Sequence, residues 1–423
     1  SDVCSSDLEY HMPEHVELHW VRVPPKVFFE PYSIRYLAEL KDLSKIFIVS
    51  DRMIYKLGYV NRVMEVLKRR RNNVEIEIYI DVPVEPTFQA IKEALGIMKS
   101  FGPDNIVALG GGSVMSAAKI MWMLYEHPEI TMEDAITTFS RLRENVFDSA
   151  TTGKISRLIC VPTTSGTGAE VSPYSVVVDD KTGKHHPLAS FSFIPSVAIV
   201  DPEFTVSLPQ KIVVENALDM LSKAIEAYTS VFSNDFANGL CLESLHLILK
   251  NFKAAFNGCF HAREKMHNAS TIAGMAAANG YLGIVHALSY KIADVFHIHT
   301  GRLAGILLPR VIRYNAQAPK DAALSQLKVY DVEEKYKKIC ERTGIEVGNS
   351  AAEALAKVCE DLMKETDAIT GISQCGVSKE DWENKIEEIA TEAASAQNNE
   401  FNPKRATVEE LKEILLKSFD PVA

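Results

Sequence analysis

The sequence has few of the features that mark a disulfide-stabilised protein. Its 423 residues include only seven cysteines, an odd number, and no two of them form a Cys-x-x-Cys pair. A disulfide framework needs an even set of closely spaced cysteines in a short secreted chain. We therefore expect reduced, mostly buried thiols in a protein of the cytoplasm.

Long apolar runs and an excess of basic side chains are also missing. No apolar stretch reaches the about 20 residues that cross a bilayer, and the first residues lack the basic-then-apolar pattern of a secretory signal. The 56 acidic and 45 basic residues give a net charge of −11. Nucleic acids and anionic membranes attract basic surfaces. We expect neither as a partner.

The chain has no internal repeat and no low-complexity tract, and its length predicts more than one domain. Residues 1–17 are polar and without periodicity, which indicates a linker remnant. Residues 18–207 alternate between short apolar runs and helix-length segments. The predicted strands are 45–51, 74–81, 105–112, 157–165 and 197–202. This alternation predicts an α/β domain with a mostly parallel sheet and helices on both faces.

The second half of the chain has a different pattern. Residues 208–423 show a 3.6-residue apolar period and no strand signal, which predicts an all-helical domain. Residues 174–188 contain Asp and Gly between two apolar runs and are typical of a β-hairpin. A cleft between the two domains is the expected place for a ligand.

Two loops rich in small residues follow predicted strands. In "ALGGGSVMSAAK" a strand runs through Gly110, Gly111, Gly112 and Ser113 into a helix. Glycines allow close backbone approach to a phosphate, and a helix start offers free N–H groups. The loop "PTTSGTGAEV" (162–171) adds hydroxyl groups that suit a sugar or a phosphate. Asp51, at the end of an earlier strand, is placed to bind a ribose hydroxyl, or is simply a helix N-cap or turn residue.

Polar residues also recur at helical spacing in the second half. Asp219 and Lys223 lie four apart, as do His286 and Tyr290, and each pair shares one helix face. His297 and His299 follow shortly after. An aspartate with several histidines is a common metal site, but a protonated lysine donates and does not coordinate. Spacing alone leaves a metal site and an Asp219–Lys223 ion pair both open.

Together these stretches resemble the iron-containing (group III) alcohol dehydrogenase family. The similarity rests on these two loops and on "DKTGKHHPLA", "IPSVAIVDPEFTVSLP", "LDMLSKAIEAYTSV", "STIAGMAAANGYLGIVH" and "VIRYNA". It is closest to the C-terminal alcohol dehydrogenase module of bifunctional aldehyde–alcohol dehydrogenases. The resemblance implies a dinucleotide domain, a helical domain, NAD(P), and Fe²⁺ or Zn²⁺ to polarise the alcohol oxygen.

The resemblance assigns the cofactor positions residue by residue. Gly110, Gly111, Gly112 and Ser113 match the pyrophosphate loop of the family, and Asp51 its NAD-preferring acid. The other matches are Thr163, Thr164 and Thr167 in the second loop and Lys184 after the hairpin turn. We therefore expect NAD as the cofactor.

The metal positions match less well. The resemblance implies one Asp and three His ligands, of which Asp219 and His286 are present, while Lys223 and Thr300 stand where the other two histidines belong. Tyr290 replaces a further histidine near the substrate. Two aspartates of the cofactor loops are replaced by Ser116 and Ser190. We therefore do not expect bound iron or zinc.

Three hypotheses follow for the activity. The first is a module of weak or absent activity, kept for structure, nucleotide binding or assembly. The second is a metal-independent reductase of small aldehydes, in which Lys223 supplies the positive charge and Tyr290 relays a proton. The third is metal-dependent activity through a different ligand set. By resemblance we also expect a homo-oligomer, and filaments where the module is part of a bifunctional protein.

Overall fold

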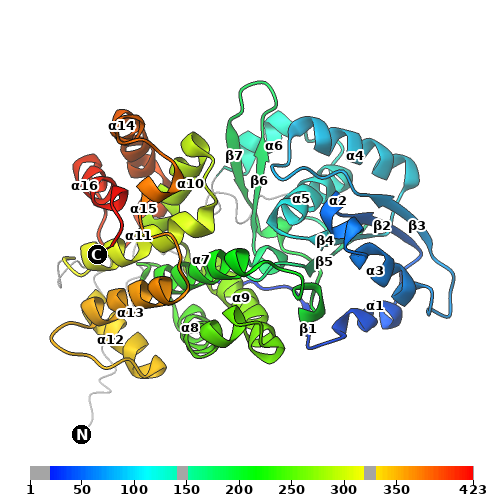
Figure 1. The fold of residues 1–423 in the computed structure, drawn as a ribbon. Coiled ribbons are helices and arrows are strands. Elements are labelled where there is room, and N and C mark those ends of the chain that lie inside the picture. Colours follow the sequence, from blue (N-terminus) through cyan, green and yellow to red (C-terminus); the bar gives the residue numbers. More distant parts are fainter. Residues whose placement is uncertain (1–19, 141–150, 319–329, 423) are drawn as a thin grey trace, which may run out of the picture.

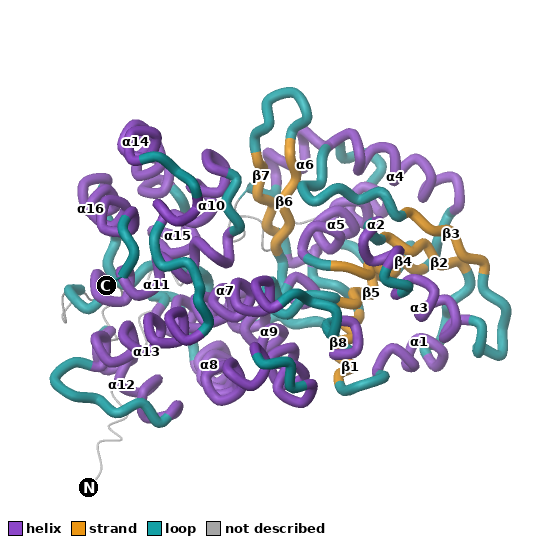
Figure 2. Tube along the Cα trace, in the orientation of Figure 1, coloured by secondary structure: helices purple, strands orange, loops and turns teal. Residues whose placement is uncertain are grey.

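The computed structural model describes residues 20–140, 151–318 and 330–422. The predicted linker remnant, 1–17, lies outside the described residues. Figure 1 shows two halves side by side, an α/β half that holds the sheet and a helical half that holds the C-terminus. Figure 2 shows that the strands are confined to the first of these halves. The predicted fold class is confirmed.

The sheet of the α/β half has six parallel strands in the order β1-β8-β5-β4-β2-β3. Their bounds are β1 Lys26–Phe29, β2 Lys45–Val49, β3 Glu75–Tyr79, β4 Asn105–Gly110, β5 Arg157–Pro162 and β8 Val197–Val200. Five of the six were predicted. The edge strand β1 was missed, because a four-residue run directly after two prolines gives little signal.

Helices cover both faces of this sheet, which explains why its central strands are apolar throughout. The helices are α1 Tyr36–Glu39, α2 Arg52–Lys56, α3 Tyr59–Leu67, α4 Phe88–Phe101, α5 Gly112–Glu126 and α6 Met132–Thr138. Phe47 and Ile106 pack with α4 and α5 on one face. Ile46 and Val107 pack with α1 and α3 on the other.

The predicted hairpin is present as a separate two-stranded sheet. Strands β6 (Tyr174–Val178) and β7 (His185–Ala189) pair antiparallel, with Val178 opposite His185 next to the turn. In Figure 1 the hairpin rises at the boundary between the two halves, close to α10. The hairpin is therefore a part of the α/β half that lies beside the helical half.

Only helices and short 3-10 turns are present in the described residues from Gln210 onward. The helices are α7 Gln210–Thr229, α8 Asp235–Phe256, α9 Phe260–Gly280, α10 Ile284–Phe296, α11 Thr300–Asn315, α12 Val332–Thr343, α13 Ala351–Glu365, α14 Lys379–Ser395, α15 Gln397–Phe401 and α16 Val408–Phe419. They share one continuous apolar core. The predicted domain boundary at 207/208 falls between Phe204, which ends the last turn of the α/β half, and Gln210, where α7 begins.

No single helix in the described ranges is long and apolar enough to cross a membrane. The pair α9 and α10 reaches the required length and composition only when joined, and the pair bends by 104°.

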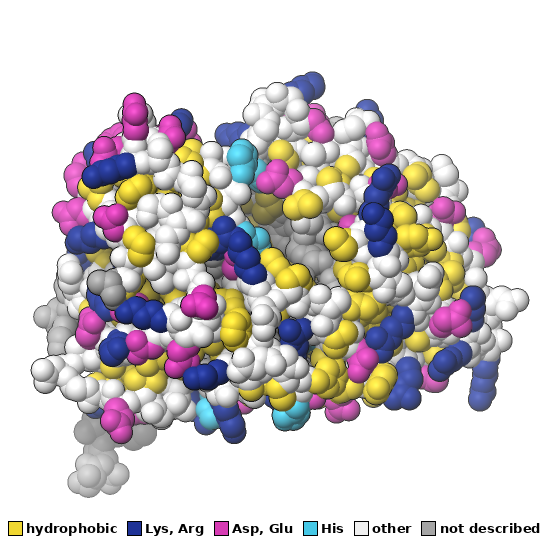
Figure 3. Space-filling model, in the orientation of Figure 1, with side chains coloured by type: hydrophobic (Ala, Val, Ile, Leu, Met, Phe, Trp, Pro, Cys, Tyr) yellow, Lys and Arg dark blue, Asp and Glu magenta, His cyan; other side chains and the backbone are white. Residues whose placement is uncertain are grey.

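The two halves meet at several places, among them an aromatic cluster and a close contact between two glycines. Tyr281 and Phe401 stack with ring centroids 4.6 Å apart, and Phe191 of the α/β half joins their cluster. The loop before β6 packs on α9, where a methyl group on Gly168 would lie 2.5 Å from Cα of Gly274. Gly168 has a φ of +62°, which also favours glycine. Figure 3 shows a hollow between the halves, with histidine side chains above and beside it.

Candidate functional site

The glycine loop lies at the carboxyl edge of the sheet, between β4 and α5. Gly110 ends β4, and Gly111 is the N-cap of α5 without a side-chain cap of its own. The Ser113 hydroxyl donates to the carbonyl of Val84. The first N–H groups of a helix have no partner within the helix and attract anions. The predicted loop is thus placed where a phosphate group fits.

The threonine loop lies directly against the glycine loop. The backbone N–H of Thr163 donates to the carbonyl of Gly110 over 3.0 Å. A methyl group on Gly111 would lie 3.4 Å from Thr164 Cγ2, and one on Gly112 would lie 3.1 Å from Thr167 Cγ2. The structure therefore brings the two predicted cofactor loops together, and larger residues at these glycines would fill the space between them.

Asp51 lies at the same edge of the sheet, one strand away. It follows β2, which pairs with β4. Its Oδ1 accepts a hydrogen bond of 2.9 Å from the N–H of Ile54 and so caps α2. The two readings of Asp51 from the sequence, helix cap and ribose acid, are compatible, since the cap uses one of the two carboxylate oxygens.

Three other positions lie apart from these loops or take structural roles. Lys184 lies in the exposed turn of the hairpin, and its carbonyl accepts from the N–H of Asp179. Ser116 Oγ accepts from the N–H of Val176 over 3.3 Å, and Ser190 Oγ accepts from Ser192 over 3.1 Å. The two serines that replace family aspartates are therefore engaged with neighbouring backbone.

Of the two possibilities that the spacing leaves open, the ion pair on α7 is present. Lys223 Nζ lies 2.6 Å from Asp219 Oδ2, and the residues are 8% and 7% exposed. The same ammonium donates to the carbonyls of Gly166 and Thr167, each over 3.1 Å. An ammonium has three donors, and here all three have acceptors. Lys223 thereby connects α7 to the threonine loop of the other half.

His286 extends the pair into a network of four charged side chains. Its Nε2 lies 3.2 Å from Asp219 Oδ1, and its Nδ1 contacts Glu226 Oε2. Glu226 Oε1 also accepts from the backbone N–H of Val285 over 2.7 Å. The sequence analysis missed Glu226, although it lies seven residues after Asp219, on the same face of α7.

The charges in this network alternate, and each one stabilises the next. Burial opposes a charge on His286, but the carboxylates of Glu226 and Asp219 outweigh it and raise the pKa of His286 to about 9. Burial likewise opposes the Asp219 carboxylate, but Lys223 and His286 hold the pKa of Asp219 well below its usual range. The site is a nearly neutral set of buried ions.

Tyr290 stands next to this network on α10. Its ring packs edge-on against His286 with centroids 5.7 Å apart, while the residue as a whole is 42% exposed. Loss of solvent around the hydroxyl, and then the charges of Asp219 and Glu226, raise the pKa of Tyr290. The hydroxyl therefore stays protonated at neutral pH and is a donor.

The remaining candidates lie at the start of α11. Thr300 is its first residue, and His299 is its N-cap. His299 Nδ1 lies 3.1 Å from Glu215 Oε2, and Arg302 donates two bonds of 2.8 and 2.6 Å to Glu215 Oε1. His297 is exposed. His299 is thus paired with a carboxylate of its own half and does not join Asp219.

These side chains do not fit the donor set that the resemblance implies for Fe²⁺ or Zn²⁺. Such ions need lone pairs from imidazole, thiolate or carboxylate, whereas Lys223 offers an ammonium to Asp219. Both nitrogens of His286 face carboxylates. Within the described ranges, no three His, Cys, Asp or Glu side chains are grouped to hold a metal.

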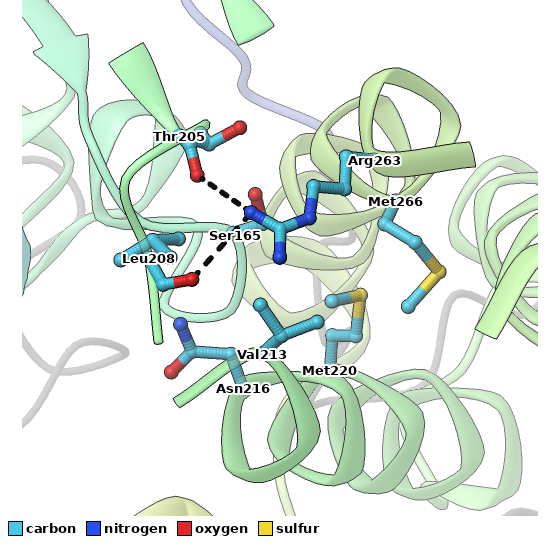
Figure 4. A pocket seen from close by; sticks show the side chains of 8 residues that line it. All are labelled: Ser165, Thr205, Leu208, Val213, Asn216, Met220, Arg263 and Met266. Carbon is cyan, nitrogen blue, oxygen red and sulfur yellow. Dashed lines mark hydrogen bonds between the residues drawn. The ribbon is translucent and has the colours of Figure 1, made fainter. Parts of the chain in front are cut away.

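A small cavity lies behind the threonine loop, where Ser165 meets α7 and α9 (Figure 4). Arg263 points into it and donates to the carbonyls of Thr205 and Leu208, over 3.4 and 3.5 Å. Ser165 Oγ lies 2.9 Å from Nδ1 of the buried His267. The Ser165–His267 contact joins the threonine loop to α9.

Comparison with known protein families gives two adjacent matches. Residues 24–202 match the family described as "Iron-containing alcohol dehydrogenase", and residues 213–419 match "Fe-containing alcohol dehydrogenase family, C-terminal". The two matches correspond to the α/β half and the helical half.

Individual relatives agree with these matches. The chain is 51% identical over 409 residues to aldehyde-alcohol dehydrogenase 2 of Entamoeba histolytica, covering 96% of this chain and 47% of that protein. It therefore spans about half the length of such relatives. It is 30% identical to NADPH-dependent butanol dehydrogenase of Clostridium saccharobutylicum, covering 93% and 96% of the two chains. The solved iron-containing alcohol dehydrogenase of Thermococcus thioreducens matches with a TM-score of 0.82 at 26% identity, covering 95% of this chain and 99% of that one.

Proposed function

The chain belongs to the iron-containing alcohol dehydrogenase family, and from that premise we propose that it is an NAD-binding alcohol dehydrogenase module in which an internal ion network replaces the metal. Its reaction class is the interconversion of a small aldehyde and a primary alcohol. The activity is weak or absent, and the module acts through nucleotide binding and assembly.

This proposal rests on one observation, that every donor of the Lys223 ammonium already has an acceptor. Its ammonium has three acceptors, on Asp219, Gly166 and Thr167. A group that stabilises an alkoxide needs a donor directed at the oxygen on which charge develops. Lys223 has no free donor in this arrangement. Its role is therefore structural, at the place where the family binds a catalytic ion.

Electrostatics also disfavour a divalent ion at this place. An ammonium beside a dication is repelled, and the repulsion is large where little water screens it. The negative charges of Asp219 and Glu226 are already balanced by Lys223 and His286. A metal would have to displace Lys223 and leave that cation buried without its partner.

Dinucleotide binding is supported by features that remain intact. The glycine and threonine loops lie together at the start of α5, where a helix N-terminus favours a pyrophosphate. Asp51 disfavours the 2′-phosphate of NADP by like charge and suits a free ribose hydroxyl. We therefore propose NAD as the cofactor, although the butanol dehydrogenase relative is named for NADPH.

One observation favours metal-independent aldehyde reduction as a second candidate. Tyr290 is partly exposed beside His286 and keeps its proton. In this reading bound NADH would supply the hydride. Tyr290 would donate a proton to the carbonyl oxygen, and Lys223 would stabilise that oxygen. Lys223 would have to release Gly166 or Thr167 when substrate binds.

One set of measurements separates these candidates. The purified chain is analysed for iron and zinc, titrated with NADH, and assayed for acetaldehyde reduction with and without added Fe²⁺ or Zn²⁺. We expect NADH binding without bound metal and with little or no turnover. Metal-free turnover that Lys223→Ala abolishes would establish the reductase. Stoichiometric metal with turnover would overturn both, and failure to bind NADH would refute the cofactor assignment.

The chain spans about half the length of its relatives. The assembly role is therefore proposed by analogy with those longer proteins. Homo-oligomers, filaments and a cytoplasmic location remain proposals from the family resemblance. Light scattering of the purified chain tests the first of them directly.

A further inference from the structure

A second group of charged residues crosses the cleft, outside the network around Lys223. His185 belongs to β7 of the α/β half, and Asp294 belongs to α10 of the helical half. His185 Nδ1 lies 2.9 Å from Asp294 Oδ1, and its Nε2 lies 3.5 Å from Glu85 Oε1. The imidazole is therefore between two carboxylates, one from each half of the molecule.

The group continues into the helical half. Lys291 Nζ lies 3.8 Å from Asp294 Oδ2 and 2.9 Å from Glu392 Oε2 on α14. The side chains of His185, Lys291 and Asp294 are only 19%, 30% and 32% exposed. Partial burial reduces screening, so these contacts are stronger than those of fully exposed pairs. Lys291 also fixes Asp294 in the position that meets His185.

The position of Asp294 relates this contact to the candidate site. His286, Tyr290 and Asp294 follow one another at four-residue intervals and share one face of α10. His286 is buried in the ion network, Tyr290 is partly exposed, and Asp294 meets the hairpin. This face of α10 therefore extends from the buried ion network at His286 to Asp294, where it contacts His185.

The hairpin is well placed to act on the width of the cleft. It is anchored to the α/β half, since Ser175 Oγ donates to the carbonyl of Ser116 and Thr87 pairs with Val178. At the root of the hairpin, Tyr174 and Ala189 pack with the Phe191–Tyr281–Phe401 cluster. His185 lies at the other end of β7, opposite Val178 next to the turn, and Figure 1 shows the hairpin next to α10.

We propose that His185 and Asp294 form a latch that holds the β6–β7 hairpin against α10 and slows release of the dinucleotide from the cleft. The role in release rests on the proposed NAD binding; the latch itself does not. His185 is a positioning residue in this scheme. It sets how readily the halves separate and needs no contact with the reacting atoms.

The latch is tested with two variants and a matched control. His185→Asn and Asp294→Asn each remove one side of the contact. His186→Asn is the control, because His186 lies on the same strand and its ring is 5.8 Å from Phe88, within the α/β half. All variants are measured in the same buffer.

Two readouts separate the latch from the cofactor assignment. Stopped-flow release of NADH should be about threefold to fivefold faster in H185N and D294N, as expected for one partly buried ion pair, and near native in H186N. Hydrogen exchange of the ligand-free protein should be faster in residues 174–189 and 290–296 of the same two variants.

The two readouts can fail independently. If NADH does not bind, the proposed function fails, while hydrogen exchange still reports on the latch. Exchange in H185N and D294N that equals that of the native chain overturns the latch. An equal effect of H186N would also overturn it, because the change would then come from the strand and not from the cross-cleft pair.

Discussion

Asp219 and Lys223 lie four residues apart on α7, and their charged atoms are 2.6 Å apart in a site where neither residue is more than 8% exposed. A buried pair of this kind responds differently to loss of one partner and to loss of both. One remaining charge is left without compensation, whereas two apolar replacements leave none. The first prediction follows from this asymmetry.

Lys223→Met should lower the free energy of unfolding by about 3–5 kcal/mol, because the Asp219 carboxylate loses its partner in a buried site. Adding Asp219→Leu should recover part of the loss. Urea unfolding followed by circular dichroism measures both. The control is Lys357→Met, since Lys357 and Asp361 have the same spacing and a 2.9 Å contact but are 67% and 48% exposed. That change should cost less than about 1 kcal/mol, and equal losses at the two sites would contradict the prediction.

Histidine at both positions 223 and 300 should give the chain a metal site. In Lys223→His with Thr300→His the ammonium is removed, and the four ligand positions that the resemblance implies are filled, with Asp219 and His286 as the other two. Glu226 already holds His286 from behind, as carboxylates do for metal-bound histidines. We expect about one Zn²⁺ or Fe²⁺ per chain after dialysis, by atomic absorption.

The two single variants are the controls for this double variant, and each should retain clearly less metal. If the double variant also stays free of metal, the loss does not reside in these two positions. Tyr290 would then be the next position to change.

Asp51→Asn should relax the preference for NADH over NADPH by about tenfold, because one negative charge near the 2′-phosphate is removed. Asparagine caps a helix as well as aspartate, so the bond to Ile54 persists and stability should be unchanged. Fluorescence titration with both nucleotides measures the ratio. Asp81→Asn, which removes an exposed acid paired with Arg52, should leave it unchanged. The same ratio in D51N and the native chain would refute the role of Asp51.

Lys119 should make the protein more stable at alkaline pH. It is fully buried on α5 and donates to the carbonyls of Ser172 and Tyr174 over 2.6 and 3.0 Å. Burial lowers the pKa of Lys119 from 10.5 to about 8, against the charges of Cys160 and Glu170. The unfolded chain then binds the proton more tightly than the folded one. Stability contributed by Lys119 therefore rises with pH between about 8 and 10.5, by about 3 kcal/mol in total.

The test compares pH profiles of urea unfolding between pH 7 and 10.5. The difference between the native chain and Lys119→Met isolates Lys119 from the tyrosines, which also titrate at high pH. Lys99→Met, an exposed lysine on α4, serves as the control. Parallel profiles for the native chain and K119M would contradict the assignment.

Much of the fold could be predicted because the physics that produces it is local. The strands around Ile46, Val107 and Ile159 are buried on both faces, so their sequences are continuous apolar runs. The hairpin could be predicted from the Asp and Gly residues of its turn. Helix periodicity placed Asp219 and Lys223 on one face, since residues four apart share a face, but it left an ion pair and a metal site both open.

The rest of the site depends on contacts between distant segments that leave no sequence signal. The acceptors of Lys223 on Gly166 and Thr167 are backbone carbonyls more than fifty residues away, which every residue type offers. Likewise, nothing in the spacing of His185 and Asp294 indicates that a hairpin and a helix place them 2.9 Å apart.

The three bonds of Lys223 also bear on whether the family chemistry could return. A metal held by Asp219 and three histidines would need two positions, 223 and 300, to change. A return to histidine at 223 alone breaks the connection between α7 and the threonine loop and still leaves Thr300 without a ligand atom of the right kind. The intermediate would lose stability before it gained a metal. Lys223 is therefore part of the joint between the two halves, and its removal alone costs stability before any metal can bind.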